Sequence, residues 1–198
     1  MTFDPFGDFE ELGYLRNIAG FKDLAMVKAL EHGSFQRNLD RVMTELADAK
    51  FIEYKHILNI HKTLFGDLYP WAGRDRWVTS PQLNISKGGY AALFAQPPYI
   101  RRVTDYALDK GRDPSIMRRQ PGYVMGALAH AHPFLDGNGR ILMVLHSELA
   151  RRAGISINWL KTEKTAYLTA LTLELNDPGK GHLDRYLKPF VCEDIEPQ

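Results

Sequence analysis

The stretch HPFLDGNGR, His132–Arg140, combines a histidine, an aspartate, a Gly-Asn-Gly turn and an arginine, and it decides the fold expected around it. The preceding run GYVMGALAHA has a helical pattern, and Pro133 disfavours the α conformation in the residue before it, so this helix should end at about His132. The run RILMVLHSELARRAG predicts a second helix directly after Gly137–Gly139, whose glycines allow a sharp turn and close approach by a ligand. The segment is therefore predicted to be a helix, a polar loop and a second helix.

The residue types in this loop suit phosphate chemistry. The free N–H groups and the dipole at the start of a helix favour an anion, most often a phosphate. Arg140 adds a fixed positive charge, and Asp136 becomes favourable if a magnesium ion bridges the carboxylate and phosphate oxygens. Histidine is the side chain most easily poised to accept a proton near neutral pH, which makes His132 a candidate base. Together they favour phosphoryl or nucleotidyl transfer.

Each residue also has a structural explanation. A histidine at a helix end is usually a cap or a packed residue, Gly-Asn-Gly is often a plain turn, and Asp136 alone could be a turn acceptor or an N-cap. In a more specific alternative hypothesis, His130, His132 and Asp136 form the zinc or iron site of a metal-dependent hydrolase. That rival leaves Arg140 and the glycines unexplained.

Composition limits the class of protein. The chain has 198 residues, 44% apolar and 25% charged, which predicts one soluble globular domain over residues 1–198 with flexible termini. A net charge of +1 provides no basic field for nucleic acid, and no apolar run is long enough to span a membrane. The N-terminus lacks an apolar signal region, and the single Cys192 excludes an internal disulfide. A reducing bacterial cytoplasm is the expected location, with delivery into another cell as the alternative.

Along the chain the dominant hydrophobic period is helical, and seven or so helices are expected. Gly33, Gly111, Gly154 and the Pro178-Gly179 pair are predicted to mark helix ends. Between Trp71 and Pro98 the β-branched segments RWVTS and QLNIS predict a short hairpin instead. The expected helices cover residues 21–33, 35–49, 53–65, 98–111, 122–131, 140–154 and 164–175.

HPFLDGNGR resembles the signature H-x-F-x-[D/E]-G-N-G-R of the Fic family at every specified position. LGYLRN, IHKTLFGDLYPWAGRDR, NISKGG and FAQPPYI are similar to further family segments in the expected order, so the resemblance covers residues 12–186. It implies a mostly α Fic-fold helical bundle with a short β-hairpin flap over the active site. It also implies a protein adenylyltransferase, which transfers AMP from ATP to a Ser, Thr or Tyr hydroxyl of a target protein.

The resemblance assigns a role to each site residue. His132 is the general base, Asp136 holds magnesium, and Phe134 anchors the loop. The phosphates are bound by the anion cradle, which comprises Gly137, Asn138, Gly139 and Arg140. The flap residues Ile85, Ser86, Lys87 and Gly88 lie over the nucleotide, where an extended target segment docks near residues 84–89 by strand addition. Tyr167 is a candidate contact of the adenine, whereas Trp71 and His61 are expected to be scaffold.

The sequence departs from the family in one place. The fuller signature carries a second arginine where this chain has Met143, and no Ser or Thr is followed four residues later by the glutamate of an inhibitory helix. Self-inhibition by that device is therefore not expected, and a separate antitoxin-like protein is one candidate for control. Because a phosphate-binding charge is missing, three alternatives to ATP-dependent AMP transfer remain. The donor could be another phosphate-containing compound, the chain could be a kinase like the protein Doc, or it could be a degenerate protein that binds nucleotide without transfer.

Overall fold

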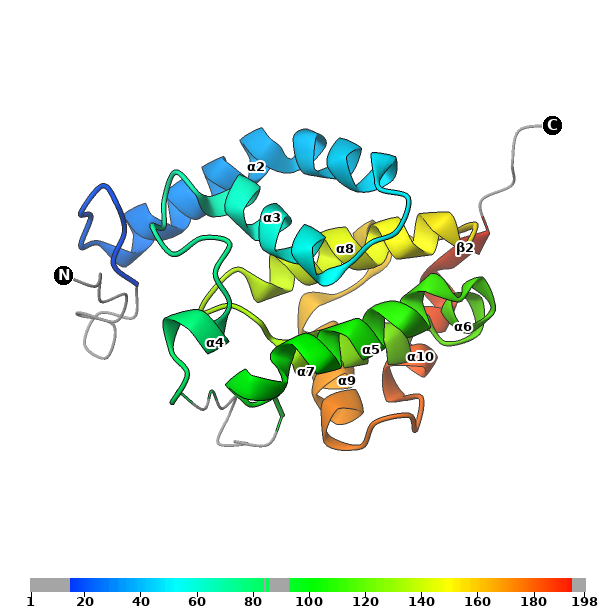
Figure 1. Cartoon of the computed structure of the whole chain (residues 1–198). Helices are drawn as coiled ribbons and strands as arrows, with labels where there is room; N and C mark the ends of the chain where they lie inside the picture. Colours follow the sequence, from blue (N-terminus) through cyan, green and yellow to red (C-terminus); the bar gives the residue numbers. More distant parts are fainter. Residues whose placement is uncertain (1–14, 84, 86–92, 194–198) are drawn as a thin grey trace. The chain divides into compact units, whose positions relative to one another are not determined.

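The structure is a computed structural model that describes residues 15–83, 85 and 93–193 (Figure 1). Most of these residues are helical, which confirms the mostly α fold class. The chain divides into two compact units, one of Met1–Phe51 with Lys55–Asp75 and the other of Ile52–Tyr54 with Arg76–Gln198. The expectation of one domain over the whole chain stays a prediction. None of the described helices has both the length and the apolar run needed to cross a lipid bilayer.

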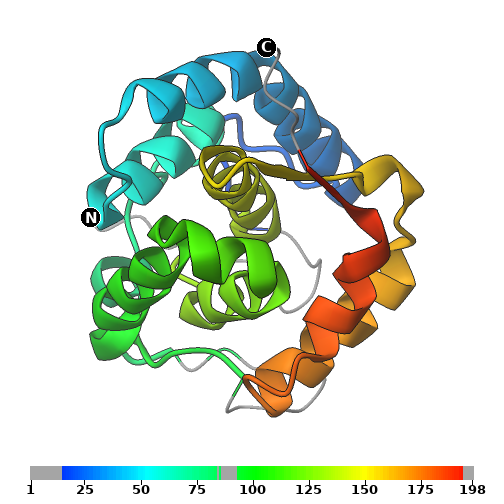
Figure 2. The same cartoon turned by 90° about the vertical axis from the view of Figure 1, so that its right-hand side faces the viewer.

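The first unit consists mainly of α2, Leu24–Asp48, and most of α3, Tyr54–Phe65, which run side by side in both views (Figures 1 and 2). The Ser34 hydroxyl donates to the Leu64 carbonyl at 2.6 Å, and the Tyr69 hydroxyl donates to the buried Glu31 carboxylate at 2.6 Å. These long-range hydrogen bonds fix α2 against α3 and the turn after it.

The helix break expected at Gly33 is wrong, because α2 continues through this residue as a single helix. A glycine inside a helix costs only about 1 kcal/mol relative to alanine, so other contacts outweigh it easily. Here the next residue, Ser34, is buried and hydrogen-bonded to Leu64 of α3. This contact holds the two helices predicted on either side of Gly33 in line as one helix. Tertiary contact therefore overrides the local signal.

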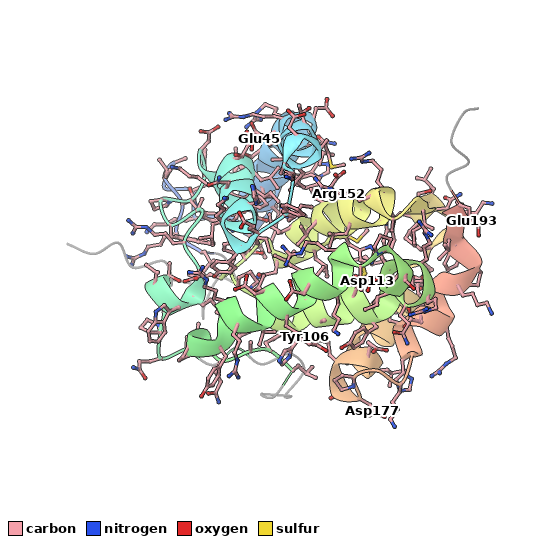
Figure 3. All side chains as sticks on the ribbon, turned by 45° about the vertical axis from the view of Figure 1, so that its right-hand side comes forward. Glu45, Tyr106, Asp113, Arg152, Asp177 and Glu193 are labelled. Carbon is pink, nitrogen blue, oxygen red and sulfur yellow. The ribbon has the colours of Figure 1, made fainter. Side chains whose placement is uncertain are left out.

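The second unit holds the remaining elements, and α7 lies among them in contact with α5, α8, α9 and α10. Figure 3 shows Asp113 between α5 and α6, where its carboxylate accepts from the backbone N–H groups of Ser115 and Ile116. The helices of this unit are α4 Arg76–Thr79, η1 Pro97–Tyr99, α5 Ile100–Arg112, α6 Pro114–Arg119, α7 Pro121–Ala131, α8 Asn138–Arg152, η2 Trp159–Lys161, α9 Lys164–Asn176, α10 His182–Leu187 and η3 Lys188–Phe190. Its two strands, β1 Ile155–Ile157 and β2 Val191–Glu193, pair antiparallel with Ser156 opposite Cys192.

Small residues let α7 pack closely on its neighbours. A Cβ atom at Gly126 would lie 2.7 Å from Glu174 Cγ of α9, and one at Gly122 would overlap the backbone of Asp184 in α10. The Asp184 carboxylate accepts hydrogen bonds from the backbone N–H groups of Gly122 at 2.6 Å and Tyr123 at 3.2 Å. The start of α7 is therefore capped from α10, while its other end leads into the polar loop.

The strand expected over RWVTS is also wrong, since these residues form the short helix α4, Arg76–Thr79. Trp77 and Val78 are both more than half exposed, so the segment does not bury one face as a sheet strand would. Arg76 instead fixes the start of α4, because its backbone N–H donates to the Pro133 carbonyl at 2.7 Å. In the second arm, QLNIS, Gln82 lies in a turn and neither Leu83 nor Ile85 is in a strand, so the prediction is wrong for these residues too, while Asn84 and Ser86 lie outside the described residues.

Candidate functional site

The polar loop between α7 and α8 starts where it was predicted to start but ends two residues earlier than predicted. The last residue of α7 is Ala131, and His132 caps it in a left-handed conformation with φ 38° and ψ 59°. His132 is the one non-glycine residue with positive φ in the described part of the chain. Gly137, with φ 79°, precedes α8, which begins at Asn138, two residues earlier than expected. Positive φ is costly for a residue with a Cβ atom, so the conformation of His132 must be held by its surroundings.

Asn138 closes the loop from within. Its side-chain oxygen accepts from the Phe134 N–H at 2.9 Å, and its side-chain nitrogen donates to the Phe134 carbonyl at 2.7 Å. The Phe134 side chain is fully buried. One asparagine therefore satisfies both backbone groups of a residue four positions earlier, and the buried phenyl ring anchors the same point. The loop is rigid at its centre.

The start of α8 has the properties of an anion site. No side chain among the described residues caps this end of the helix, so its first N–H groups point out of the loop. A Cβ atom at Gly139 would meet nothing within 4 Å, which leaves open space beside the first turn. Arg140 follows in the same turn, with a side chain 28% exposed. The helix end therefore offers N–H donors, room and a positive charge together.

Asp136 has the chemistry to hold a magnesium ion here. Its Oδ1 atom accepts from the Gly137 N–H at 2.6 Å and lies 4.0 Å from Nη2 of Arg140, while its side chain stays 35% exposed. Magnesium in phosphate-transfer sites takes only one or two protein carboxylates and fills its remaining positions with phosphate oxygens and water. A single accessible carboxylate at an anion-binding helix end fits that donor set.

The His132 side chain is packed on one face and fixed at its backbone. The rings of Phe94 and His132 stack with centroids 3.9 Å apart. Nε of Arg76 donates to the His132 carbonyl at 2.8 Å, and the Arg76 backbone N–H donates to the adjacent Pro133 carbonyl at 2.7 Å. The His132 side chain is half-buried rather than enclosed. An incoming hydroxyl can therefore reach an imidazole whose orientation is restrained.

The rival metal site is not formed. Nδ1 of His130 donates to the Leu93 carbonyl at 2.8 Å, and the His130 carbonyl accepts from the Ala95 N–H at 2.8 Å. In residues 15–83, 85 and 93–193, no three His, Cys, Asp or Glu side chains are grouped to hold a metal ion. Since His130, His132 and Asp136 all lie in that part, the three-ligand hypothesis is wrong. His130 serves to attach the segment at Leu93–Ala95 to the end of α7.

The remaining predicted residues lie around the loop or beyond the described part of the chain. Ile85 is half-buried, while Ser86, Lys87 and Gly88 lie outside the described residues. Tyr167 packs edge-on against Trp159, with ring centroids 5.7 Å apart, and its hydroxyl is 3.1 Å from the sulfur of Met125. Burial raises the pKa of the Tyr167 hydroxyl. This side chain is thus engaged in packing on α7.

The scaffold expectation for His61 and Trp71 is confirmed, since both are buried in the first unit. Nδ1 of His61 accepts from the Gly73 N–H at 2.9 Å, and its ring lies against Trp71 with centroids 5.5 Å apart. Met143 is half-buried on α8. It shares a helix face with Gly139 and Arg140, because residues three and four positions apart are neighbours on a helix.

Sequence reasoning missed two residues that shape the site, Arg76 and Phe94. Both occur in segments that carry the Fic resemblance, PWAGRDR and FAQPPYI, but neither has an evident role in the sequence. Arg76 is fully buried, which is rare for an arginine and requires hydrogen-bond partners. Its partners are backbone carbonyls from distant segments, so no local pattern could have identified them.

The chain is similar to proteins that are named as protein adenylyltransferases. The chain is similar to protein adenylyltransferase VbhT of Bartonella schoenbuchensis, 34% identical over 163 residues, which cover 81% of this chain and 34% of that protein. It is 26% identical over 166 residues to the probable protein adenylyltransferase y4lH of Sinorhizobium fredii, with 79% of this chain and 81% of that protein covered. The chain thus spans about a third of the length of VbhT.

Solved structures show the same fold. The BepC protein of Bartonella tribocorum, crystallised with bound AMPPNP, superposes with a TM-score of 0.71 at 21% identity and covers 90% of this chain and 92% of that one. An N-terminal Fic domain from Bartonella quintana with bound ADP gives a TM-score of 0.71 at 18% identity, covering 93% and 94%. The family model described as Fic/DOC family matches residues 51–150, half of the chain and the whole polar loop within it. The chain therefore belongs to the Fic/DOC family.

Proposed function

We propose that this protein is an adenylyltransferase that transfers AMP from ATP to a hydroxyl side chain of a target protein. The observation that carries the proposal is the joint geometry of His132 and α8. A restrained imidazole ends one helix, and an uncapped helix start follows it across a loop that Asn138 closes. The proposed base and the proposed anion site therefore lie on the same loop. The names of the similar proteins, and the nucleotides bound in BepC and the Bartonella quintana domain, support nucleotide as the ligand.

In the proposed reaction, His132 removes the proton from the target's Ser, Thr or Tyr hydroxyl. The oxygen then forms a bond to the α-phosphorus of ATP, and the bond from that phosphorus to the bridging oxygen breaks, so pyrophosphate leaves. The N–H groups of Asn138 and Gly139 stabilise the negative charge on the phosphate oxygens, and Arg140 neutralises the outer phosphates. The Gly137 N–H donates to Asp136 instead, so Gly137 contributes the turn that precedes α8. Magnesium, held by Asp136, supplies additional charge neutralisation when bound.

The target protein docks, in this proposal, on the flap near residues 84–89. Strand addition would give affinity through backbone hydrogen bonds that do not depend on the target's side chains. Choice of target then depends on other surfaces. Tyr167 stays a weak candidate for the adenine contact, since its ring packs on Trp159 and its hydroxyl points to Met125. We also propose that a separate antitoxin-like protein controls the activity. The proposed place of action is the cytoplasm, or another cell into which the protein is delivered.

A second candidate is transfer from a different phosphate-containing donor. The observation in its favour is Met143, which stands on the helix face of Gly139 and Arg140 where the family signature has an arginine. Without that charge, the outermost phosphate of ATP loses one partner. A donor with fewer phosphates would lose less of its binding free energy from the missing charge.

The test is incubation of the purified chain with a cell extract and ATP labelled at either the α- or the γ-phosphate. Label from the α position only is expected, and His132→Ala should abolish it while ATP binding measured by calorimetry stays within about threefold, because the imidazole acts on the hydroxyl rather than on the phosphates. His32→Ala, which changes an exposed histidine on α2, is the matched control and should behave as wild type. Label from the γ position would identify a kinase and contradict the proposal.

A further inference from the structure

Arg76 bridges the catalytic loop and both ends of the flap region. Its Nε donates to the His132 carbonyl at 2.8 Å, its Nη2 donates to the Ala95 carbonyl at 2.7 Å, and its Nη1 lies 3.4 Å from the Leu83 carbonyl. Leu83 immediately precedes, and Ala95 follows, the segment 84–92 that contains the proposed target-docking residues. One guanidinium group therefore contacts three separate stretches of backbone.

The backbone of Arg76 adds a fourth contact, since its N–H donates to the Pro133 carbonyl at 2.7 Å. The carbonyls of His132 and Pro133 are thus both held by the same residue. His132 is the residue with the left-handed backbone, and a conformation of this kind persists only where neighbouring groups determine it. Arg76 supplies that constraint at the two peptide groups on the C-terminal side of the imidazole.

The other end of this network reaches the imidazole ring. Ala95, bound by Arg76 through its carbonyl, donates its N–H to the His130 carbonyl at 2.8 Å. Phe94, one residue earlier, stacks on the His132 ring at 3.9 Å. The same arginine therefore restrains His132 from its own backbone and, through Ala95, from the aromatic ring that lies against it.

Simple packing does not explain an arginine at this position. Arg76 is fully buried, and a buried charge costs free energy unless its donors are satisfied, so an apolar side chain would fill the same space at less cost. A lysine could not replace it either, because an ammonium group lacks the planar fork that reaches carbonyls on different segments at once. The arrangement is specific to the geometry of a guanidinium.

We propose that Arg76 is the positioning residue of the catalytic loop, which holds the His132 imidazole in its productive orientation and joins it to the two ends of the flap region. The inference rests on the proposed function, in which His132 is the base. Arg76 touches neither nucleotide nor target in this account. It acts through His132, so its loss should reduce turnover much more than nucleotide affinity.

The test compares Arg76→Lys with Arg118→Lys. Arg118 is the matched control, because its Nε also donates to a backbone carbonyl, that of Ala153 at 2.6 Å, but at the far end of α8. Arg76→Lys is expected to lower kcat for AMP transfer by about 10- to 100-fold, the effect of displacing a reacting group by roughly 1 Å, with KM for ATP changed by less than about threefold. It should also shift the NMR resonances of the His132 ring, assigned with His132→Ala. Arg118→Lys should change neither.

Two results would overturn the inference: wild-type kcat with unshifted His132 resonances in Arg76→Lys, or equal effects from Arg118→Lys. If the wild-type chain transfers no AMP, the proposed function fails, and the ring resonances of the two variants still decide the role of Arg76. If Arg76→Lys does not fold, hydrogen exchange of the arginine Nε–H groups in the wild-type chain decides it. The Nε–H of Arg76 should exchange far more slowly than that of Arg101, whose side chain is 77% exposed, and equal rates would refute the contacts in solution.

Discussion

His146 makes the stability of this protein depend on pH in a way that can be calculated. It lies on α8 with its side chain fully buried, its Nε2 donates to the carbonyl of Pro121 at 2.8 Å, and its Nδ1 has no partner among the described residues. Burial lowers the pKa of His146 from 6.5 to about 4, because the imidazolium form would lose its hydration. The neutral ring connects α8 to the first residue of α7, so it joins the two helices that carry the catalytic loop.

The direction of the effect follows from the two pKa values. Between pH 6.5 and pH 4 the unfolded chain binds a proton at His146 that the folded chain does not, so stability falls as the pH decreases through this window. At 1.36 kcal/mol per pKa unit, His146 removes about 2.5 kcal/mol of unfolding free energy between pH 7.5 and pH 4.5. That amount is a large fraction of the stability of a typical domain.

The assay is urea denaturation, followed by circular dichroism, at pH 7.5 and pH 4.5. His146→Gln keeps a donor for the Pro121 carbonyl but cannot titrate. Between pH 7.5 and pH 4.5, its unfolding free energy should therefore fall by about 2.5 kcal/mol less than that of wild type. The comparison uses the change in unfolding free energy between the two pH values, wild type against variant. Titrating groups common to both proteins cancel in it, and so does any pH-independent effect of the substitution. His32→Gln, at an exposed position, should follow wild type. Equal losses in wild type and His146→Gln would refute the reasoning.

Four further predictions concern residues of α7 and α8. Gly126→Ala should lower the unfolding free energy by about 1–3 kcal/mol, because its Cβ would lie 2.7 Å from a side-chain carbon of α9. Gly139→Ala, with open space at its Cβ, should leave stability unchanged or raise it by up to about 1 kcal/mol yet weaken ATP binding, and unweakened binding would argue against a phosphate at this turn. Asn138→Ala should cost about 1–3 kcal/mol in urea denaturation, since both backbone groups of Phe134 lose their partners, and an unchanged midpoint would contradict that role. Met143→Arg should lower the Kd for ATP in calorimetry, whereas an unchanged or higher Kd would place this side chain away from the phosphates.

The parts of the site that could be predicted are those with local causes. Pro133 restricts the residue before it, so α7 ends at Ala131 with His132 as its cap, and Gly137 makes the predicted sharp turn before α8. Gly139 was expected in the same turn but lies in the first turn of α8. Gly154 likewise follows the last helical residue, Arg152, with φ 72°, as expected of a helix stop. In each case the signal and the structure lie within a few residues of each other.

The parts that could not be predicted depend on contacts between distant segments. Gly33 was expected to break a helix, but the bond from Ser34 to the chain thirty residues later keeps α2 continuous. RWVTS was expected to be a strand, but the hydrogen bond from the Arg76 N–H to Pro133 starts a helix there instead. The buried guanidinium of Arg76 has the same origin, since its partners are carbonyls that no sequence pattern marks.

The most direct test of the central claim is a crystal structure of this chain with a non-hydrolysable ATP analogue and magnesium. We predict that phosphate oxygens accept hydrogen bonds from the N–H groups of the first turn of α8, beside Arg140 and Asp136. The α-phosphorus should lie where a hydroxyl oxygen could contact both it and the His132 imidazole. Phosphates bound elsewhere, or an imidazole turned away from the α-phosphate in the complex, would contradict the account.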